Sequence, residues 1–322
     1  MNRTPSASPM LLNCCQVCES QTGYPHIVKE IMLGTGDEFL YWECAECGCL
    51  SLTAIPERLE KYYPDTYYSL RTRVPKLTRK LRDRIYLSRL SFLVNWRGRS
   101  DLDVIRRVGL TKKMRLLDVG CGSGSLLSDL RELGYNAQGV DPFVPGDLRD
   151  RFGVRVRCSS LNEVSGEYDV ILFRHSLEHM PIHMLRVAAE HLAEGGVCAV
   201  CIPLLGWAWK SYKSHWAQLD APRHFFLHSR KSFAMLAEKS GFQVERVVYD
   251  STEFQFWASE SYQQGIPLNQ IAPPTWAQRR RLRRLAAALN SQEQGDMAQF
   301  YLRLRKDTKS SSSATPLAAA AM

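Results

Sequence analysis

The sequence predicts an α/β protein built on a parallel sheet, with a small cysteine-rich module in front of it. Three observations lead to this prediction. Short apolar runs alternate with helical patterns between residues 113 and 258, a glycine-rich loop follows the first of these runs, and six of the ten cysteines lie within the first 49 residues. Alternating strands and helices favour a parallel sheet that is covered by helices on both faces.

The expected elements of the sheet domain are short and well separated. The candidate strands are MRLLDV (114–119), NAQGV (136–140), VRVRC (154–158), YDVILF (168–173) and GVCAVCIP (196–203). The candidate helices are SLLSDLRELG (125–134), MLRVAAEHLAEG (184–195) and SFAMLAEKSG (232–241). Apolar residues recur at helical spacing in the second set only, which distinguishes the two kinds of element.

The chain divides into six segments by composition. They are a flexible leader (1–12), a cysteine-rich module (13–55), a basic helical connector (56–112), the sheet domain (113–258), a C-terminal helical extension (259–306) and a low-complexity, disordered tail (307–322). Within the connector, LTRKLRDRIYLSRLSFLVNW (77–96) predicts an amphipathic helix.

Charge and hydropathy limit where the protein works and what it meets. The longest uncharged apolar run, 195–209, is shorter than a membrane span of about 20 residues. The first residues lack the apolar core of a secretory signal, so we expect a cytoplasmic protein with reduced cysteines. The net charge of +9 comes partly from ten Lys/Arg in residues 71–99 and five Arg in residues 279–284. These stretches could be solvated helix faces, or could contact nucleic acid or an anionic membrane.

The glycine-rich loop predicts a cofactor cradle. Gly120, Gly122 and Gly124 follow the first strand at alternate positions, and a helix begins directly after them. Glycine permits a sharp turn and a close ligand, and open α/β sheets bind ligands at this edge. Asp118, two residues before the first glycine, would repel a pyrophosphate but suits a ligand with an amino group. Asp141, at the end of the second strand, can accept hydrogen bonds from both ribose hydroxyls.

These residues resemble the class I S-adenosylmethionine-dependent methyltransferases. The resemblance implies a Rossmann-like sheet of seven strands, one of them antiparallel. It implies that Asp118, Gly120, Gly122, Gly124 and Asp141 bind S-adenosylmethionine. YDVILFRHSLEHMP (168–181) resembles the fourth strand and following loop of the small-molecule branch. That similarity places His175 at the methionine end of the cofactor, and Glu178 and His179 on the substrate side. GFQVERVVYD (241–250) resembles the sixth strand.

The cysteine-rich module predicts a structural zinc site. Two C-x-x-C pairs, Cys15/Cys18 and Cys44/Cys47, offer four thiolates for a tetrahedral ion and leave no open position for catalysis. Cys14 and Cys49 could replace one of them. The stretch YWECAECGCLSLTAIPERLEKYYPDTYY (41–68) resembles the zinc-ribbon-like segment attached to some sugar- and natural-product-modifying methyltransferases.

Two histidines are candidates for the catalytic base. His179 follows the fourth strand, and His224 lies in WAQLDAPRHFFLHS (216–229), where Asp220 and Arg223 could orient it or bind an acidic substrate. A structural role is equally compatible with either histidine. The sequence therefore predicts methyl transfer to a small-molecule acceptor, such as a sugar, a nucleotide-sugar or a secondary metabolite. RNA methylation and a non-catalytic recognition protein that binds S-adenosylmethionine are the alternatives, and the oligomeric state stays open.

Overall fold

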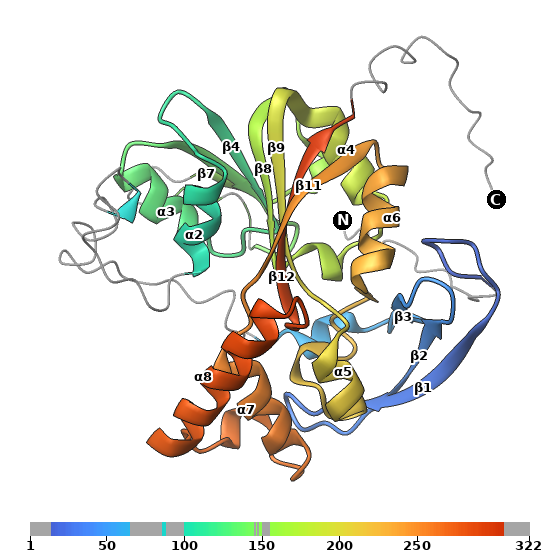
Figure 1. Cartoon of the computed structure of the whole chain (residues 1–322). Helices are drawn as coiled ribbons and strands as arrows, with labels where there is room; N and C mark the ends of the chain where they lie inside the picture. The colour runs from blue at the N-terminus through green and yellow to red at the C-terminus, as the bar shows by residue number, and fades with distance from the viewer. Residues whose placement is uncertain are drawn as a thin grey trace.

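Two β-sheets organise the chain, and helices pack around them (Figure 1). The computed structural model describes residues 14–64, 86–87, 100–144, 146, 148–149 and 155–305. The predicted amphipathic helix over 77–96 lies outside these residues, apart from Tyr86 and Leu87. Among the described residues, no helix combines the length and the apolar character that a membrane crossing would need.

The large sheet has the strand order β11-β12-β9-β8-β4-β5-β7-β6. Its strands are β4 (Arg115–Val119), β5 (Asn136–Val140), β6 (Leu148–Arg149), β7 (Arg155–Arg157), β8 (Tyr168–Arg174), β9 (Leu192–Pro203), β11 (Phe242–Tyr249) and β12 (Met297–Leu304). The five from β9 to β7 run parallel, and β12 is antiparallel to both of its neighbours. The predicted seven-stranded mixed sheet is confirmed, and the two-residue β6 adds an antiparallel strand at the β7 edge.

Helices cover both faces of this sheet because successive strand residues point to opposite sides. Leu116 on β4 packs in one core with helices α2 (Ser100–Arg107) and α3 (Ser125–Glu132). Its neighbour Leu117 packs in the other core with α4 (Met184–His191) and α6 (Arg230–Lys239). Figure 1 shows the two helix pairs on opposite sides of the strands.

Residues 297–304 correct one expectation, because we predicted them to be part of a helical extension. They form β12, which inserts between β9 and β11. Phe300 and Tyr301 are buried in the two different cores, so this strand is apolar on both faces. The aromatic residues favour a strand, and pairing on both edges overrides the weaker helical pattern.

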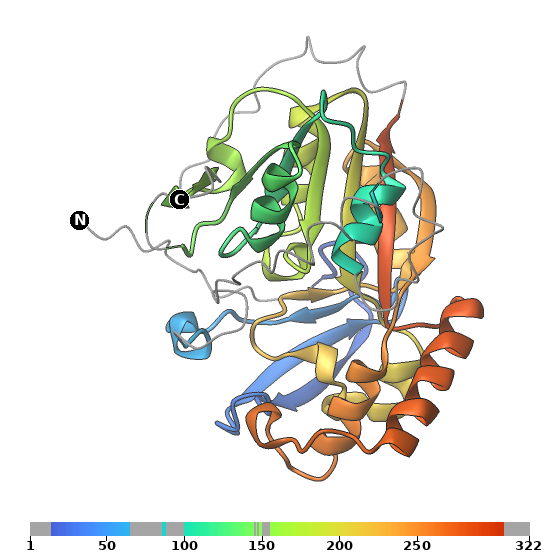
Figure 2. The same cartoon turned by 90° about the vertical axis from the view of Figure 1, so that its left-hand side faces the viewer.

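The remaining helices form a separate group beside the small sheet (Figures 1 and 2). They are α5 (Trp207–Tyr212), α7 (Glu253–Tyr262) and α8 (Trp276–Ser291). The basic run 279–284 lies on α8, where Arg281 pairs with Glu260 at 2.7 Å and Arg283 pairs with Glu253 at 2.9 Å. Glutamates of α7 therefore neutralise part of the positive charge of this run.

The small sheet contains strands from two distant parts of the chain. Its order is β1 (Gly23–Lys29), β2 (Glu38–Cys44), β3 (Leu50–Leu52) and β10 (Phe226–Leu227). The first three strands come from the cysteine-rich module, but β10 comes from the segment that contains His224. The module and the large domain are therefore connected through one continuous hydrogen-bonded sheet.

Candidate active site

The glycine-rich loop leads from β4 into α3, as predicted. Gly120, Gly122 and Gly124 have φ angles of +72°, +54° and +72°, which favour glycine over any residue with a Cβ. A Cβ on Gly120 would lie 2.5 Å from the Ser176 Cβ. Asp118, only 1% exposed, is buried at the end of β4. The loop therefore brings bare backbone and a carboxylate to the carboxyl edge of the sheet.

Asp141 lies beside this loop at the end of β5. Its Oδ2 accepts a hydrogen bond from the Gly122 N–H at 2.8 Å, and its Oδ1 accepts one from the Phe143 N–H at 2.9 Å. A carboxylate oxygen can accept two hydrogen bonds, so each oxygen keeps capacity for a hydroxyl donor. These contacts fix the carboxylate where the chain turns away from the sheet.

His175 follows β8 at the same edge. Its backbone adopts φ +55°, and its N–H donates to the Cys201 carbonyl at 2.9 Å. Its side chain is 41% exposed, and its Nδ1 lies 4.0 Å from Glu178 Oε1. His175 is thus the more accessible of the two histidines that flank Glu178 in the sequence.

The two candidate catalytic histidines lie together, next to Glu178. The His179 and His224 rings are 4.6 Å apart between centroids and meet edge to face. His179 Nδ1 lies 2.8 Å from the Arg223 carbonyl, and His224 Nδ1 lies 2.8 Å from the Gln218 carbonyl. We call Glu178, His179 and His224 the E-H-H cluster. Sequence reasoning put Glu178 on the substrate side but did not include it among the site residues.

Burial sets the protonation of the E-H-H cluster. Desolvation lowers the pKa of His179, and it lowers the pKa of His224 to about 3, with His179 contributing. Both imidazoles are therefore neutral near pH 7. Desolvation raises the pKa of Glu178 to about 8, and the nearby Asp220 carboxylate adds to the shift.

Arg223 is part of a buried ion network. Its guanidinium is fully buried and donates to Asp220 at 2.6 and 3.0 Å, to Glu30 at 2.9 Å and to the Tyr62 carbonyl at 3.2 Å. Burial by itself would raise the pKa of Asp220, but Arg223 outweighs it and lowers that pKa. This network links the cysteine-rich module, the connector and the His224 segment.

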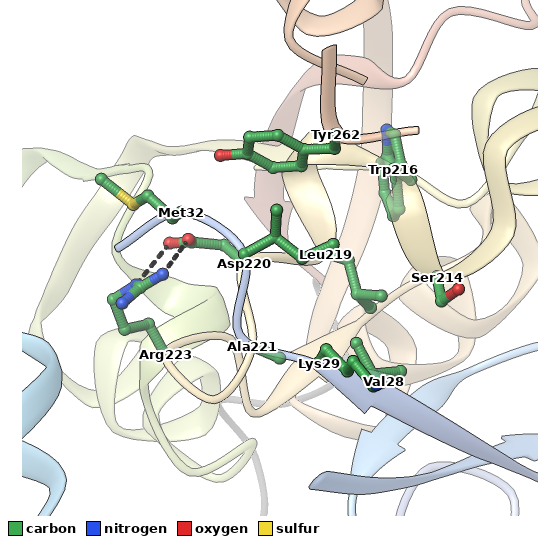
Figure 3. A pocket seen from close by; sticks show the side chains of 11 residues that line it. Val28, Lys29, Met32, Ser214, Trp216, Leu219, Asp220, Ala221, Arg223 and Tyr262 are labelled. Atoms are coloured by element: carbon green, nitrogen blue, oxygen red, sulfur yellow. Dashed lines mark hydrogen bonds and ion pairs between the residues drawn. The ribbon is translucent and has the colours of Figure 1, made fainter. Parts of the chain in front are cut away.

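A small cavity adjoins this network (Figure 3). It lies between Met32 and Val28 of the module and Tyr262 of α7, and Asp220 and Arg223 form part of its wall. Neither the glycine-rich loop nor the E-H-H cluster contributes to its lining. The cavity is therefore distinct from the edge of the sheet where the predicted site residues meet.

Contacts from distant segments hold the His224 region in place, and sequence reasoning missed most of them. The Tyr41 hydroxyl on β2 donates to the His224 carbonyl at 2.8 Å. Tyr63 lies 3.2 Å from His179 Nδ1 through its hydroxyl and stacks on Phe143 with 5.9 Å between ring centroids. No local motif marks Glu30 or Tyr41, because their partners Arg223 and His224 lie 193 and 183 residues away in the sequence.

The four predicted zinc ligands converge. Cys15 and Cys47 lie 3.5 Å apart through their sulfurs, and Cys18 and Cys44 lie 3.4 Å apart. All four sulfurs lie within 4.8 Å of one another, which fits a tetrahedral thiolate site. A hydrogen bond with the Cys49 thiol is the main reason why the pKa of Cys15 is lowered to about 4, so Cys15 favours the thiolate form. Cys14 is exposed and outside the group.

Comparison with known proteins agrees with this geometry. Residues 93–247 match the model of a methyltransferase-domain family. Trans-aconitate 2-methyltransferase of Mycobacterium sp. (strain KMS) is 30% identical over 179 residues, which cover 51% of this chain and 63% of that protein. Ubiquinone biosynthesis O-methyltransferase of Azorhizobium caulinodans is 33% identical over 102 residues, 28% of this chain and 40% of that protein. The chain thus spans less than two thirds of either relative.

A solved structure aligns with a larger share of the chain. It is a SAM-dependent methyltransferase of Thiobacillus denitrificans in complex with S-adenosyl-L-homocysteine, which is 17% identical with a TM-score of 0.39. The alignment covers 72% of this chain and 99% of that one. Residues 93–247 thus resemble a methyltransferase domain, over slightly less than half of the 322 residues of this chain.

Proposed function

We propose that this protein transfers a methyl group from S-adenosylmethionine to a small-molecule acceptor, such as a sugar, a nucleotide-sugar or a secondary metabolite. The observation that carries the proposal is the glycine-rich loop with the Asp141 carboxylate at its edge. The names of the two relatives support a small acceptor, because ubiquinone precursors and trans-aconitate are small molecules.

The residues at the sheet edge fit S-adenosylmethionine. Gly120, Gly122 and Gly124 would let the cofactor approach the backbone, since a Cβ at Gly120 already meets Ser176. Asp141 would accept the ribose hydroxyls, and Asp118 and His175 would lie toward the methionine end. The bound cofactor supplies an electrophilic methyl group on a sulfonium, so the protein's contribution is orientation and charge.

The acceptor would lie against His179 and His224, which we propose as the catalytic residues. Their ring nitrogens on the side away from the backbone carbonyls can accept a hydrogen bond from an acceptor hydroxyl. The low pKa of His224, about 3, makes it a hydrogen-bond acceptor and orienting group more than a strong proton acceptor.

The four clustered cysteines are proposed to hold a structural zinc ion. A segment as small as residues 14–64 has little core of its own, and zinc binding stabilises such modules. Thiolate ligands require a reducing compartment, which fits a cytoplasmic location.

The test is isothermal titration with S-adenosylhomocysteine. We expect micromolar binding that Asp141→Ala weakens by at least roughly tenfold, since two ribose hydrogen bonds to a charged acceptor are lost. Asp169→Ala is the matched control, because Asp169 also accepts a backbone N–H, from Arg115 at 2.7 Å, and lies in the first half of β8, away from the loop. A folded protein that does not bind would contradict the proposal.

Acceptor screening follows the titration. Sugar nucleotides and hydroxylated metabolites are tested first, and RNA is tested at low and high salt, because RNA binding through Lys and Arg would weaken as salt rises. Binding to anionic vesicles tests the membrane contact in the same way. Cofactor binding without turnover of any acceptor would favour the non-catalytic alternative.

A further inference from the structure

We propose that the E-H-H cluster binds one divalent transition-metal cation, at a site separate from the four cysteines. Glu178 and His179 come from the turn after β8, and His224 comes from the segment before β10. One ligand atom from each lies within 4.8 Å of the other two. Metal–ligand bonds of about 2.0–2.2 Å place neighbouring ligands roughly 3–4 Å apart, so small side-chain rotations would close the site.

Both histidines are held in the tautomer that a metal needs. A backbone carbonyl only accepts hydrogen bonds, so His179 Nδ1 and His224 Nδ1 must carry the protons that they share with the Arg223 and Gln218 carbonyls. The Nε2 atoms are then unprotonated and keep a lone pair. Fixing a ligand imidazole through its other nitrogen is the usual outer-shell arrangement of metal sites.

Glu178 supplies the third ligand and needs a counter-charge. Its side chain is 2% exposed, and within the described part of the chain neither carboxylate oxygen has a hydrogen-bond partner. A buried carboxylate in this state is costly unless it is protonated or paired with a cation.

The surrounding charges also favour a cation. Two buried carboxylates, on Glu30 and Glu178, lie in this region together with the Asp220 carboxylate, whose side chain is 11% exposed. Arg223 is the guanidinium that pairs with Glu30 and Asp220. His224 Nε2 lies 3.9 Å from Asp220 Oδ2, so the lone pair points into a negatively charged region. His175 Nδ1 also lies near the Glu178 carboxylate, at 4.0 Å from its Oε1.

Two nitrogens and one carboxylate select the class of ion. Imidazole and carboxylate together suit iron, manganese, cobalt or zinc, and three protein ligands leave open positions for other molecules. The cluster adjoins the glycine-rich loop, since Ser176 packs against Gly120 and Asp141 acts electrostatically on His179. If the proposed methyl transfer holds, an acceptor oxygen on the open positions would ionise more readily, and the histidines would act as metal ligands instead of bases.

Manganese(II) is the probe, because it prefers nitrogen and oxygen ligands to the four thiolates. Full-length protein that carries a single equivalent of zinc, which the four thiolates prefer, is titrated with Mn²⁺. Binding is followed by electron paramagnetic resonance, in which bound ion loses the six-line signal of free Mn²⁺. We expect one bound Mn²⁺ per chain. Glu178→Gln and His224→Gln should each weaken binding at least roughly tenfold, the usual loss when a ligand or its outer shell is changed. His183→Gln, an exposed histidine four residues beyond His179, should leave it unchanged.

Titration with S-adenosylhomocysteine on the same samples separates this inference from the proposed function. Variants that keep cofactor binding but lose Mn²⁺ support the metal site. Wild-type protein that binds the cofactor but no Mn²⁺ overturns the metal site alone. Equal Mn²⁺ binding by wild type, Glu178→Gln and His224→Gln also overturns it, because the ion would then lie elsewhere. Loss of cofactor binding in wild type would contradict the proposed function, whatever the metal result.

Discussion

The two halves of the candidate site differ in how the chain builds them. The proposed cofactor half, from Asp118 to Asp141, comes from one strand–loop–helix–strand unit of 24 consecutive residues. The proposed acceptor half, the E-H-H cluster, is held by contacts of its segments with Glu30, Tyr41 and Tyr63, which lie far away in the sequence. Local backbone geometry fixes the first half, whereas docking of the cysteine-rich module fixes the second. The two halves should therefore respond separately to perturbation.

Loss of the proposed zinc ion should give the largest difference between the halves. Cys44→Ser removes a thiolate from the four-cysteine group, so the module and its pairing with β10 should loosen. Hydrogen exchange of peptides covering 216–229 should rise at least roughly tenfold, while the glycine-rich loop changes less than about twofold, because stability is not uniform across a structure.

Cys14→Ser is the control for this experiment, since Cys14 is exposed and outside the group. Equal loosening of residues 115–127 and 216–229 would show that the two halves are one cooperative unit.

Removal of Arg223 should have the next largest effect. Arg223→Ala leaves the Asp220 and Glu30 carboxylates buried without their guanidinium, and breaking a buried pair from one side costs about 3–5 kcal/mol. Urea unfolding measures the free energy of unfolding. Arg284→Ala, an exposed change on α8, should stay within about 0.5 kcal/mol of wild type. A cost below about 1 kcal/mol for Arg223→Ala would mean that the network does not join the module to the domain.

Gly120→Ala should lower the free energy of unfolding by less than Arg223→Ala does, and should act on the proposed cofactor half. The new Cβ would meet Ser176 and would force an alanine into positive φ, at a combined cost of about 1–3 kcal/mol. Gly109→Ala isolates the backbone cost, because Gly109 has φ +67° and nothing lies within 4 Å of its added Cβ. Adding Ser176→Gly to Gly120→Ala should restore only the steric part. Thermal unfolding and cofactor titration measure both effects, and full rescue by Ser176→Gly would refute the φ contribution.

Sequence reasoning worked where the information is local. The strand, the three alternating glycines and the acid after the second strand are neighbours in the chain, and so are the members of each C-x-x-C pair. The prediction of a helical extension over residues 297–304 was wrong, because the strand character of β12 depends on pairing with β9 and β11. The ion network escaped prediction because Glu30 and Arg223 are 193 residues apart, and no spacing rule connects two such residues.

The position of β12 also bears on how the molecule is made. β9 and β11 lie on either side of β12 and do not pair with each other in the finished sheet. Yet β12 is the last strand of the described chain to be synthesised. Until it leaves the ribosome, β9 and β11 each keep an unpaired edge, and unpaired edges in incomplete sheets favour association between chains. Completion of the large sheet thus waits for synthesis of residues 297–304, and chains that stop before residue 297 would be exposed to aggregation and proteolysis.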